Sequence, residues 1–231
     1  MFGLKTSNIL NQINKILIPI GCFGCFSPLR KGERLICTVC RNQLPLTEYN
    51  FTDENPIDRI FYGRVDIEKA SAFLFFTQNS IVKNLIHHLK YKNQQEIGTF
   101  LGDWYGQSIH KRPKVDFVVP VPLHRKKLTK RGYNQVTNFG KRMADHFNAV
   151  YVENALKKTA NTRTLTKKNR FSRWKTNENL YELETKELLK NKSVLLVDDV
   201  ITTGATIEAC ATALKEAENV TIYVAVMAIV P

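Results

Sequence analysis

The hydrophobic positions between residues 70 and 231 fall into short blocks, and each block has the period of a strand or of a helix. Apolar runs bounded by polar residues predict strands at residues 70–76, 117–121, 194–197 and 221–230. Apolar residues at helical spacing predict helices at residues 81–90, 94–110 and 134–147, with one more helix after the third strand. Because strands alternate with helices, we expect an α/β fold whose parallel sheet has a ligand crevice at the carboxyl ends of its strands.

The first 66 residues have a different pattern. Apolar residues at helical spacing predict an amphipathic helix at residues 6–18, which packs on the protein or on a partner; membrane contact is the weaker alternative. Residues 44–66 mix proline, asparagine and aspartate with scattered aromatics, which is typical of a linker. We therefore expect an N-terminal part at residues 1–66 and a main domain at residues 67–231.

The overall composition is that of an ordinary globular protein. The 231 residues are 43% hydrophobic and 24% charged, which excludes a largely disordered or collagen-like chain. Each apolar run is shorter than the ~20 residues that cross a bilayer, and polar residues interrupt the apolar positions near the N-terminus. We expect no membrane insertion, no signal peptide and a cytoplasmic location.

Four of the five cysteines form two C-x2-C pairs, and we expect them to bind one zinc ion: Cys22, Cys25, Cys37 and Cys40. Four protein thiolates fill a tetrahedral site, so the zinc would be structural and would fold a loop-rich segment without a core of its own. The alternative is two unrelated thiol pairs or disulfides. Cys210 lies on the apolar side of a predicted helix and is expected to be a buried structural thiol.

The formal net charge of +13 favours polyanionic partners such as nucleic acid or phosphate-rich metabolites. Most of the excess lies in two basic stretches, at residues 111–131 and 157–175. The alternative is a basic surface that is merely solvated, because net charge bears on association and not on fold.

The most informative segment joins the third predicted strand to the helix after it. Asp198 and Asp199 end the strand, and carboxylates can accept hydrogen bonds from the vicinal hydroxyls of a sugar. The turn that follows is rich in hydroxyl groups, and its glycine lets backbone N–H groups converge on an anion at a helix N-terminus. It consists of Thr202, Thr203, Gly204, Ala205 and Thr206. Together these residues indicate a pocket for a ribose 5-phosphate group; the alternative is a coincidental strand, turn and helix cap.

This segment resembles the 5-phosphoribosyl 1-pyrophosphate (PRPP) signature of type I phosphoribosyltransferases. The resemblance implies that Asp198 and Asp199 are catalytic and bind the ribose hydroxyls, and that residues 202–206 bind the 5-phosphate. It also implies Mg²⁺, held mainly by oxygens of the ligand.

Further motifs, in the same order and spacing, resemble those of the ComF (ComF/GntX) family, whose members join an N-terminal zinc module to a phosphoribosyltransferase domain. They lie at residues 85–92, 119–125, 131–135 and 173–177. One position departs from the family pattern, since Leu165 stands where many relatives carry glutamine.

Both basic stretches offer candidate ligands for pyrophosphate, whose charge requires several cations. The first stretch contributes Arg125, Lys126, Lys127, Lys130 and Arg131. The second resembles the mobile hood of such enzymes, with the candidates Arg163, Arg170 and Arg173. His124 either moves a proton or only donates and accepts hydrogen bonds, and Trp174 either stacks on a base or packs against the hood.

Two functions of different classes remain open. The first is a PRPP-dependent transferase with an unidentified acceptor, linked to DNA uptake in competence or to nucleotide metabolism. The second is a non-catalytic sensor of PRPP or a nucleotide that binds single-stranded DNA through its basic surface. Proteins of the DNA-uptake machinery are the expected protein partners in either case. A generic zinc-ribbon nucleic-acid binder is less favoured, because the cysteine segment itself contains few bases.

Overall fold

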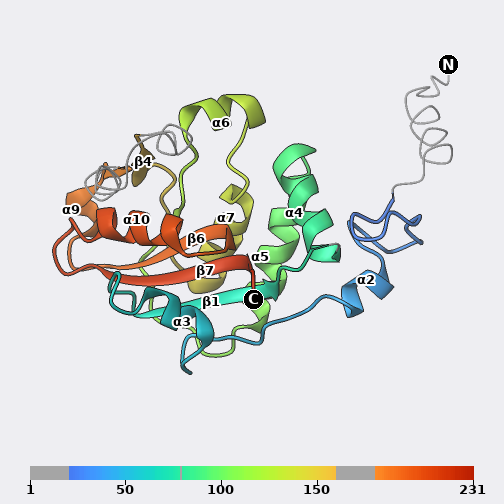
Figure 1. Cartoon of the computed structure of the whole chain (residues 1–231), viewed down its shortest axis with the longest axis horizontal. Helices are drawn as coiled ribbons and strands as arrows, with labels where there is room; N and C mark the ends of the chain where they lie inside the picture. The colour runs from blue at the N-terminus through green and yellow to red at the C-terminus, as the bar shows by residue number, and fades with distance from the viewer. Residues whose placement is uncertain (1–20, 79, 160–179) are drawn as a thin grey trace, which may run out of the picture.

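The computed structural model describes residues 21–78, 80–159 and 180–231 (Figure 1). The helix expected at residues 6–18 lies outside this part of the chain, as do the candidates Arg163, Arg170, Arg173 and Trp174 and the departing residue Leu165. Among the helices described, none is long and apolar enough to cross a membrane.

A five-stranded sheet forms the centre of the main domain, and all four of its neighbouring pairs are parallel. Its strands, in order across the sheet, are β1 (Lys69–Phe75), β7 (Thr221–Ile229), β6 (Ser193–Ile201), β2 (Phe117–Pro120) and β3 (Val150–Tyr151). β6 lies in the middle and pairs with β7 from Ser193 to Ile201. The parallel sheet and four of its strands agree with the hydrophobic pattern of the sequence, whereas the two-residue edge strand β3 was not predicted.

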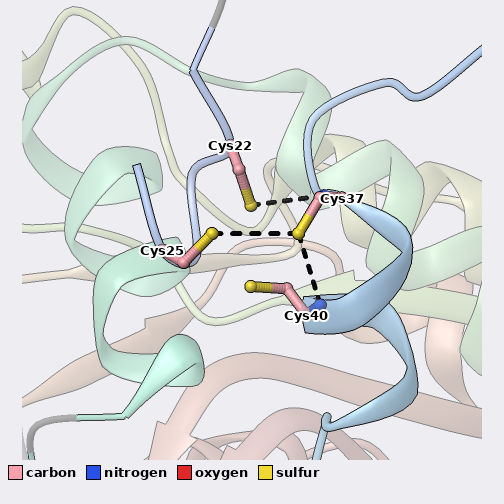
Figure 2. A group of neighbouring side chains, drawn as sticks. All are labelled: Cys22, Cys25, Cys37 and Cys40. Carbon is pink, nitrogen blue, oxygen red and sulfur yellow. Dashed lines mark hydrogen bonds between the residues drawn. The ribbon is translucent and has the colours of Figure 1, made fainter. Parts of the chain in front are cut away.

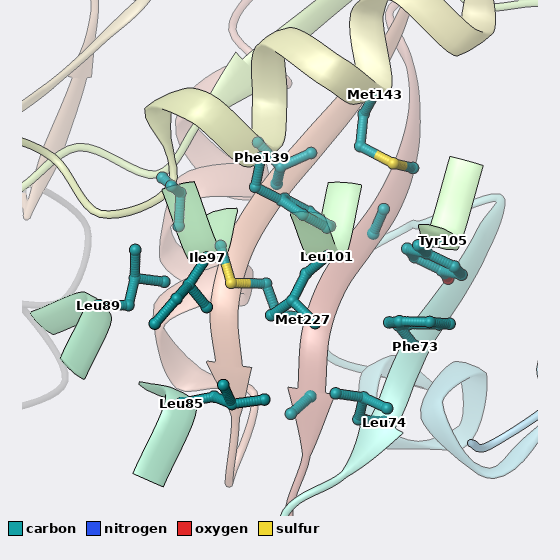
Figure 3. Close-up of a cluster of buried hydrophobic side chains, with 14 of the residues drawn as sticks. Phe73, Leu74, Leu85, Leu89, Ile97, Leu101, Tyr105, Phe139, Met143 and Met227 are labelled. Carbon is teal, nitrogen blue, oxygen red and sulfur yellow. The ribbon is translucent and has the colours of Figure 1, made fainter. Parts of the chain in front are cut away.

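Helices cover both faces of the sheet, and each face has its own hydrophobic cluster. One face carries α4 (Ile81–Tyr91), α5 (Glu96–Ser108) and α7 (Thr137–Phe147). The other carries α3 (Pro56–Phe61), α9 (Lys186–Leu189) and α10 (Ala205–Leu214). Figure 3 shows the first cluster, in which Leu85 and Leu89 of α4 meet Ile97 and Leu101 of α5. Cys210 is fully buried in the second cluster, as expected.

Close packing between α5 and α7 fixes the position of α7 on the sheet. A Cβ atom at Gly102 would lie 3.0 Å from the carbonyl oxygen of Phe139, so a side chain at this position would push the helices apart. The segment that leads into α7 contains Gln135, which is buried. The helix contact therefore places this residue beside the end of β6.

The cysteine segment packs against α4, beside which it lies in Figure 1 together with α2 (Thr38–Asn42). Asn84 of α4 donates a hydrogen bond of 2.7 Å from Nδ2 to the carbonyl of Gly24. The buried residues Cys22, Ile36 and Cys40 belong to the same hydrophobic cluster as α4. The cysteine segment and the main domain therefore share one core.

Residues 44–66, expected to be a linker from their composition, pack against the main domain. Leu46 forms an antiparallel bridge with Leu74, which places the segment along the free edge of β1. Covering an edge strand in this way removes its unpaired backbone groups from solvent. The segment also forms α3, which begins with a capping box between Asn55 and Asp58.

Two local structures lie beside the carboxyl edge of the sheet. β4 (Leu156–Lys158) and β5 (Tyr181–Leu183) form an antiparallel ribbon that flanks residues 160–179. A short helix, α6 (Arg125–Arg131), forms where the sequence suggested only a basic loop. His124 caps its first turn, good helix formers fill it, and Gly132 ends it with a φ of 79°.

Candidate functional site

Strand β6 brings two carboxylates to the carboxyl edge of the sheet, one on each face. Successive side chains of a strand point to opposite faces. Leu195 and Val197 belong to the cluster with α4 and α7, and Asp199 continues that face. Asp198 continues the face covered by α10. Both aspartates are buried, with exposed fractions of 8% for Asp198 and 5% for Asp199.

Asp199 is held by two residues from the helical layer on its face. Lys90, near the end of α4, donates a hydrogen bond of 2.7 Å from Nζ to Oδ1, and Gln135 donates one of 2.5 Å from Nε2 to Oδ2. The other side of the Gln135 amide accepts a bond of 2.5 Å from Nη1 of Arg131. Both oxygens of the buried carboxylate are therefore compensated, as burial of a charge requires.

Asp198 faces a group of titratable residues on the opposite side of the sheet. Its Oδ1 accepts the backbone N–H of Asp199 at 2.8 Å. Lys158 of β4 donates a hydrogen bond of 2.7 Å to the hydroxyl of Tyr181 in β5. The charges of Asp198 and Lys158 influence each other, and the charge of Lys127 in α6 also acts on Lys158. The β4–β5 ribbon and α6 thus bring cations towards Asp198.

The burial of this group shifts its proton equilibria. Burial, reinforced by the charge of Asp199, raises the pKa of Asp198 from its ordinary 3.8 to about 7. Burial also lowers the pKa of Lys158. Near neutral pH, Asp198 can therefore adopt two forms. The ionised carboxylate can accept hydrogen bonds from two hydroxyls, and the protonated carboxylic acid can donate one hydrogen bond.

The turn after β6 opens towards solvent. Gly204 is the N-cap of α10, has a φ of 76°, and makes no side-chain capping bond. Four of the five turn residues are exposed: Thr202, Thr203, Ala205 and Thr206. Together with Asp198 the turn lines a small cavity of about 40 Å³. A helix N-terminus whose N-cap residue offers no capping side chain, next to a buried carboxylate, can receive an anion and a hydroxyl group from one ligand.

The candidates of the first basic stretch lie on α6, which stands above the sheet in Figure 1 and buries none of its residues. Arg131 reaches Asp199 through Gln135. Arg125 and Lys126 form no side-chain bond to either aspartate in the described part of the chain. His124 accepts the N–H of Lys126 on Nδ1 at 3.2 Å, so its contact here is a helix cap.

The four cysteines expected to bind metal come together beside α4 (Figure 2). Their sulfurs all lie within 4.8 Å of one another, and those of Cys25 and Cys37 are 3.8 Å apart. In a tetrahedral site with metal–sulfur bonds of ~2.3 Å, neighbouring sulfurs lie about 3.8 Å apart. All the cysteines are free thiols. The cluster can therefore hold a metal ion such as zinc.

Backbone N–H groups support this cluster. Gly24 and Cys37 donate to the sulfur of Cys22 at 3.3 and 3.2 Å. Bonds from Ser27 lower the pKa of Cys25 to about 6, whereas burial and the neighbouring thiols raise that of Cys40. Closely packed thiols oppose one another's ionisation unless a cation is shared among them, which fits a metal-binding role.

Three residues of the site were not assigned a role from the sequence: Lys90, Gln135 and Lys158. Lys90 and Gln135 both lie in segments that resemble ComF motifs, which was the available signal. Their role needs the fold, because they lie 109 and 64 residues from Asp199 in the chain. Lys158 lies near the start of the second basic stretch and, unlike the exposed Lys157 before it, is partly withdrawn from solvent in the β4–β5 ribbon.

Part of the main domain is similar to a phosphoribosyltransferase domain. Residues 138–229 match the family model described as phosphoribosyl transferase domain. The matched segment runs from α7 to β7 and includes β6 and the turn after it. The fold class expected from the sequence is thereby confirmed.

The chain is also homologous to Competence protein F of Haemophilus influenzae. The two are 27% identical over 139 residues, which make up 57% of this chain and 61% of the relative. The match thus spans less than two thirds of that relative's length. With the cysteine cluster, it confirms the resemblance that the sequence motifs indicated.

Solved structures similar to the chain include two enzymes. One is glutamine PRPP amidotransferase from B. subtilis in complex with ADP and GMP, with 18% identity, a TM-score of 0.44, and coverage of 61% of this chain and 30% of that chain. The other is adenine phosphoribosyl transferase from Trypanosoma brucei in complex with AMP, pyrophosphate and ribose 5-phosphate, with 11% identity, a TM-score of 0.37, and coverage of 78% and 82%.

The raised pKa of Asp198 predicts a specific dependence of stability on pH. Between pH ~4 and ~7 the folded protein keeps a proton that the unfolded chain has lost, so the free energy of unfolding falls as pH rises through this window. Asp198→Asn removes this contribution. The melting temperature of the variant minus that of wild type should therefore be larger at pH 7.5 than at pH 4.5. The expected increase is about 2–4 °C for each kcal/mol of unfolding free energy that wild type loses over this range. Parallel curves for the two proteins would show that the pKa of Asp198 is not raised, and the exposed Asp53→Asn serves as the control.

Proposed function

We propose that the chain binds PRPP with Mg²⁺ at the carboxyl end of β6 and transfers its ribosyl phosphate group. The observation that carries this proposal is the shared cavity, which is lined by the buried carboxylate of Asp198 and by the exposed turn at residues 202–206. A ribose 5-phosphate group needs both a hydroxyl acceptor and an anion site a few residues apart. The phosphoribosyltransferase-type domain supports this ligand class.

The two aspartates would have separate tasks. Ionised Asp198 would accept hydrogen bonds from the ribose hydroxyls, because it lines the cavity. Asp199 would bind the ligand from the other side of the strand and exchange part of its bonding with Lys90 or Gln135 for a ribose hydroxyl. Mg²⁺, held mainly by ligand oxygens, supplies charge neutralisation to the pyrophosphate.

Ribosyl transfer would break the bond between C1 and the pyrophosphate oxygen, whose electron pair leaves with the pyrophosphate. The acceptor nucleophile then forms its bond to C1. Positive charge develops on the ribose ring and negative charge on the leaving group, so cations placed beforehand lower the barrier. The bases of α6, with Lys158 beside Asp198, are the residues proposed for this task.

We further propose that the cysteine cluster holds one structural zinc ion, in a reducing cytoplasmic setting that keeps the thiols free. The four sulfurs would fill all four positions of a tetrahedral site and leave none open. The ion would therefore stabilise the fold rather than take part in catalysis. Because the cluster packs on α4, it would also support the helix that carries Lys90. A role linked to DNA uptake in competence or to nucleotide metabolism, with DNA-uptake proteins as partners, is supported by the homology to Competence protein F.

A pyrophosphate-release assay tests the transferase proposal. With PRPP and Mg²⁺, a panel of bases, amines and oligonucleotides should contain an acceptor that releases pyrophosphate. Asp198→Asn should weaken PRPP binding in calorimetry by roughly 10-fold or more, because a carboxylate accepts hydrogen bonds more strongly than an amide. Tight PRPP binding without pyrophosphate release would favour the sensor, and unchanged affinity in the variant would contradict the assigned site.

Metal analysis tests the zinc proposal. Purified protein should contain about one zinc per chain, and Cys22→Ser should lose it, since Cys22 is fully buried within the cluster. Cys210→Ser is the matched control, because Cys210 is equally buried but lies outside the cluster. Zinc content that is zero in the wild type, or unaffected by Cys22→Ser, would refute the site.

Binding of single-stranded DNA is a second candidate function, favoured by one surface observation. Tyr91 is 62% exposed at the end of α4, and the guanidinium of Arg131 lies 5.2 Å from its ring. Next to it, α6 presents five bases that form no ion pair within the described part of the chain. A base can stack on an exposed aromatic ring while neighbouring cations that form no ion pair neutralise the phosphates of the strand.

A salt titration tests this second function. Binding of a fluorescent oligothymidine should weaken steeply with salt, with a slope of about −0.7 for each phosphate contact. Alanine at Lys126, Lys127 and Lys130 should reduce that slope by about 2. Alanine at Lys186, Lys190 and Lys192, around α9, removes the same charge elsewhere and should leave the slope nearly unchanged. A slope that is flat, or reduced equally by both triple variants, would count against DNA binding at α6.

A further inference from the structure

We infer that Arg64 is a positioning residue for the phosphate-binding turn, an inference that rests on the proposed PRPP site. Arg64 follows α3 and reaches across to the turn after β6, 139 residues further along the chain. Its Nη1 donates to the carbonyl oxygen of Thr203 at 2.8 Å and to that of Ile60 at 3.0 Å. Its Nη2 donates to the carboxylate of Glu208 in the first turn of α10. One guanidinium thus joins α3, the turn and the following helix.

The bond to Thr203 determines where the turn directs its N–H groups. A trans peptide is planar, and its carbonyl and N–H point in opposite directions. Because the Thr203 carbonyl points to Arg64, the N–H of Gly204 in the same peptide points away from Arg64. In the part of the chain that the structure describes, the N–H groups of Thr203 and Gly204 have no protein acceptor. The N–H of Gly204 is therefore free for an anion on the side opposite Arg64.

Helix α3 supports the same turn with apolar contacts. A Cβ atom at Gly204 would lie 2.6 Å from Cγ2 of Ile60 and 3.0 Å from Cε1 of Phe61, so the turn is packed directly against the helix. The helix itself is tied to the sheet, because Asp58 accepts the N–H of Ala70 in β1 at 2.8 Å. The segment at residues 44–66 thus packs against the proposed phosphate-binding turn and supports it.

Arg64 should orient the peptide between Thr203 and Gly204 but add little to the free energy of unfolding. The side chains of Arg64 and Glu208 are 34% and 33% exposed, and partly exposed ion pairs add little to stability. A charge-assisted hydrogen bond to a backbone carbonyl nevertheless restricts the peptide that carries it. Loss of Arg64 should therefore impair recognition of the 5-phosphate more than it lowers the melting temperature.

Calorimetry with ribose 5-phosphate tests this inference. Arg64→Gln should raise the dissociation constant by roughly 10-fold, as expected for a lost hydrogen bond from a charged group. Arg59→Gln is the matched control, since Arg59 lies on α3, shortly before Arg64 in the chain, and pairs with the exposed Glu54 instead. The affinity of this variant should equal that of wild type. Arg64→Lys should be intermediate, because an ammonium group keeps the charge but not the guanidinium geometry.

Phosphorus NMR of bound PRPP separates positioning from a general loss of structure. In Arg64→Gln the resonance of the 5-phosphate should move, while those of the pyrophosphate should stay at their wild-type positions. Equal affinity for ribose 5-phosphate in wild type and Arg64→Gln, or equal shifts of all three phosphorus resonances, would overturn the inference and leave the proposed function standing. Failure of wild type to bind either ligand would instead overturn the proposed function, and this inference with it.

Discussion

The site depends on the pleat of one buried strand. Adjacent residues of β6 point to opposite faces of the sheet, so Asp198 and Asp199 enter two different environments although they are neighbours in sequence. Burial of each carboxylate requires compensation. On one face the protein supplies it fully, with Lys90 and Gln135 on Asp199. On the other face Asp198 is left with a raised pKa beside an open cavity, which is where a ligand can complete its bonding.

The peripheral segments of the chain are arranged around this strand. The cysteine cluster packs on α4, and the last turn of α4 carries the lysine that bonds to Asp199. The segment before β1 covers the edge of the sheet, forms α3, and contacts the turn at residues 202–206 through Arg64. Segments that a domain boundary near residue 66 would assign to a separate N-terminal part therefore contribute to the geometry of the main site.

Local pattern was enough to predict much of this structure. Four strands of the sheet and the long helices follow from apolar periodicity, whereas β3, β4 and β5 are two or three residues long and were missed. The cysteine pairs and the turn around Gly204 follow from residue types at short spacing. What the sequence did not reveal is long-range pairing. No local signal connects Lys90 or Gln135 with Asp199, or Arg64 with Thr203, because these contacts form only when distant elements pack on one sheet. Helix α6 was missed for another reason: its abundant charge suggested a loop, whereas its cap at His124 and its end at Gly132 make it a helix.

We propose that the buried carboxylate of Asp198 and the N-terminus of α10 form a single site for a phosphorylated pentose. Amide NMR of ¹⁵N-labelled protein during a titration with ribose 5-phosphate tests it most directly. The N–H signals of Thr203, Gly204 and Ala205 should shift together and saturate with the same dissociation constant. Signals of this turn that stay in place while other amides respond to the ligand would contradict it.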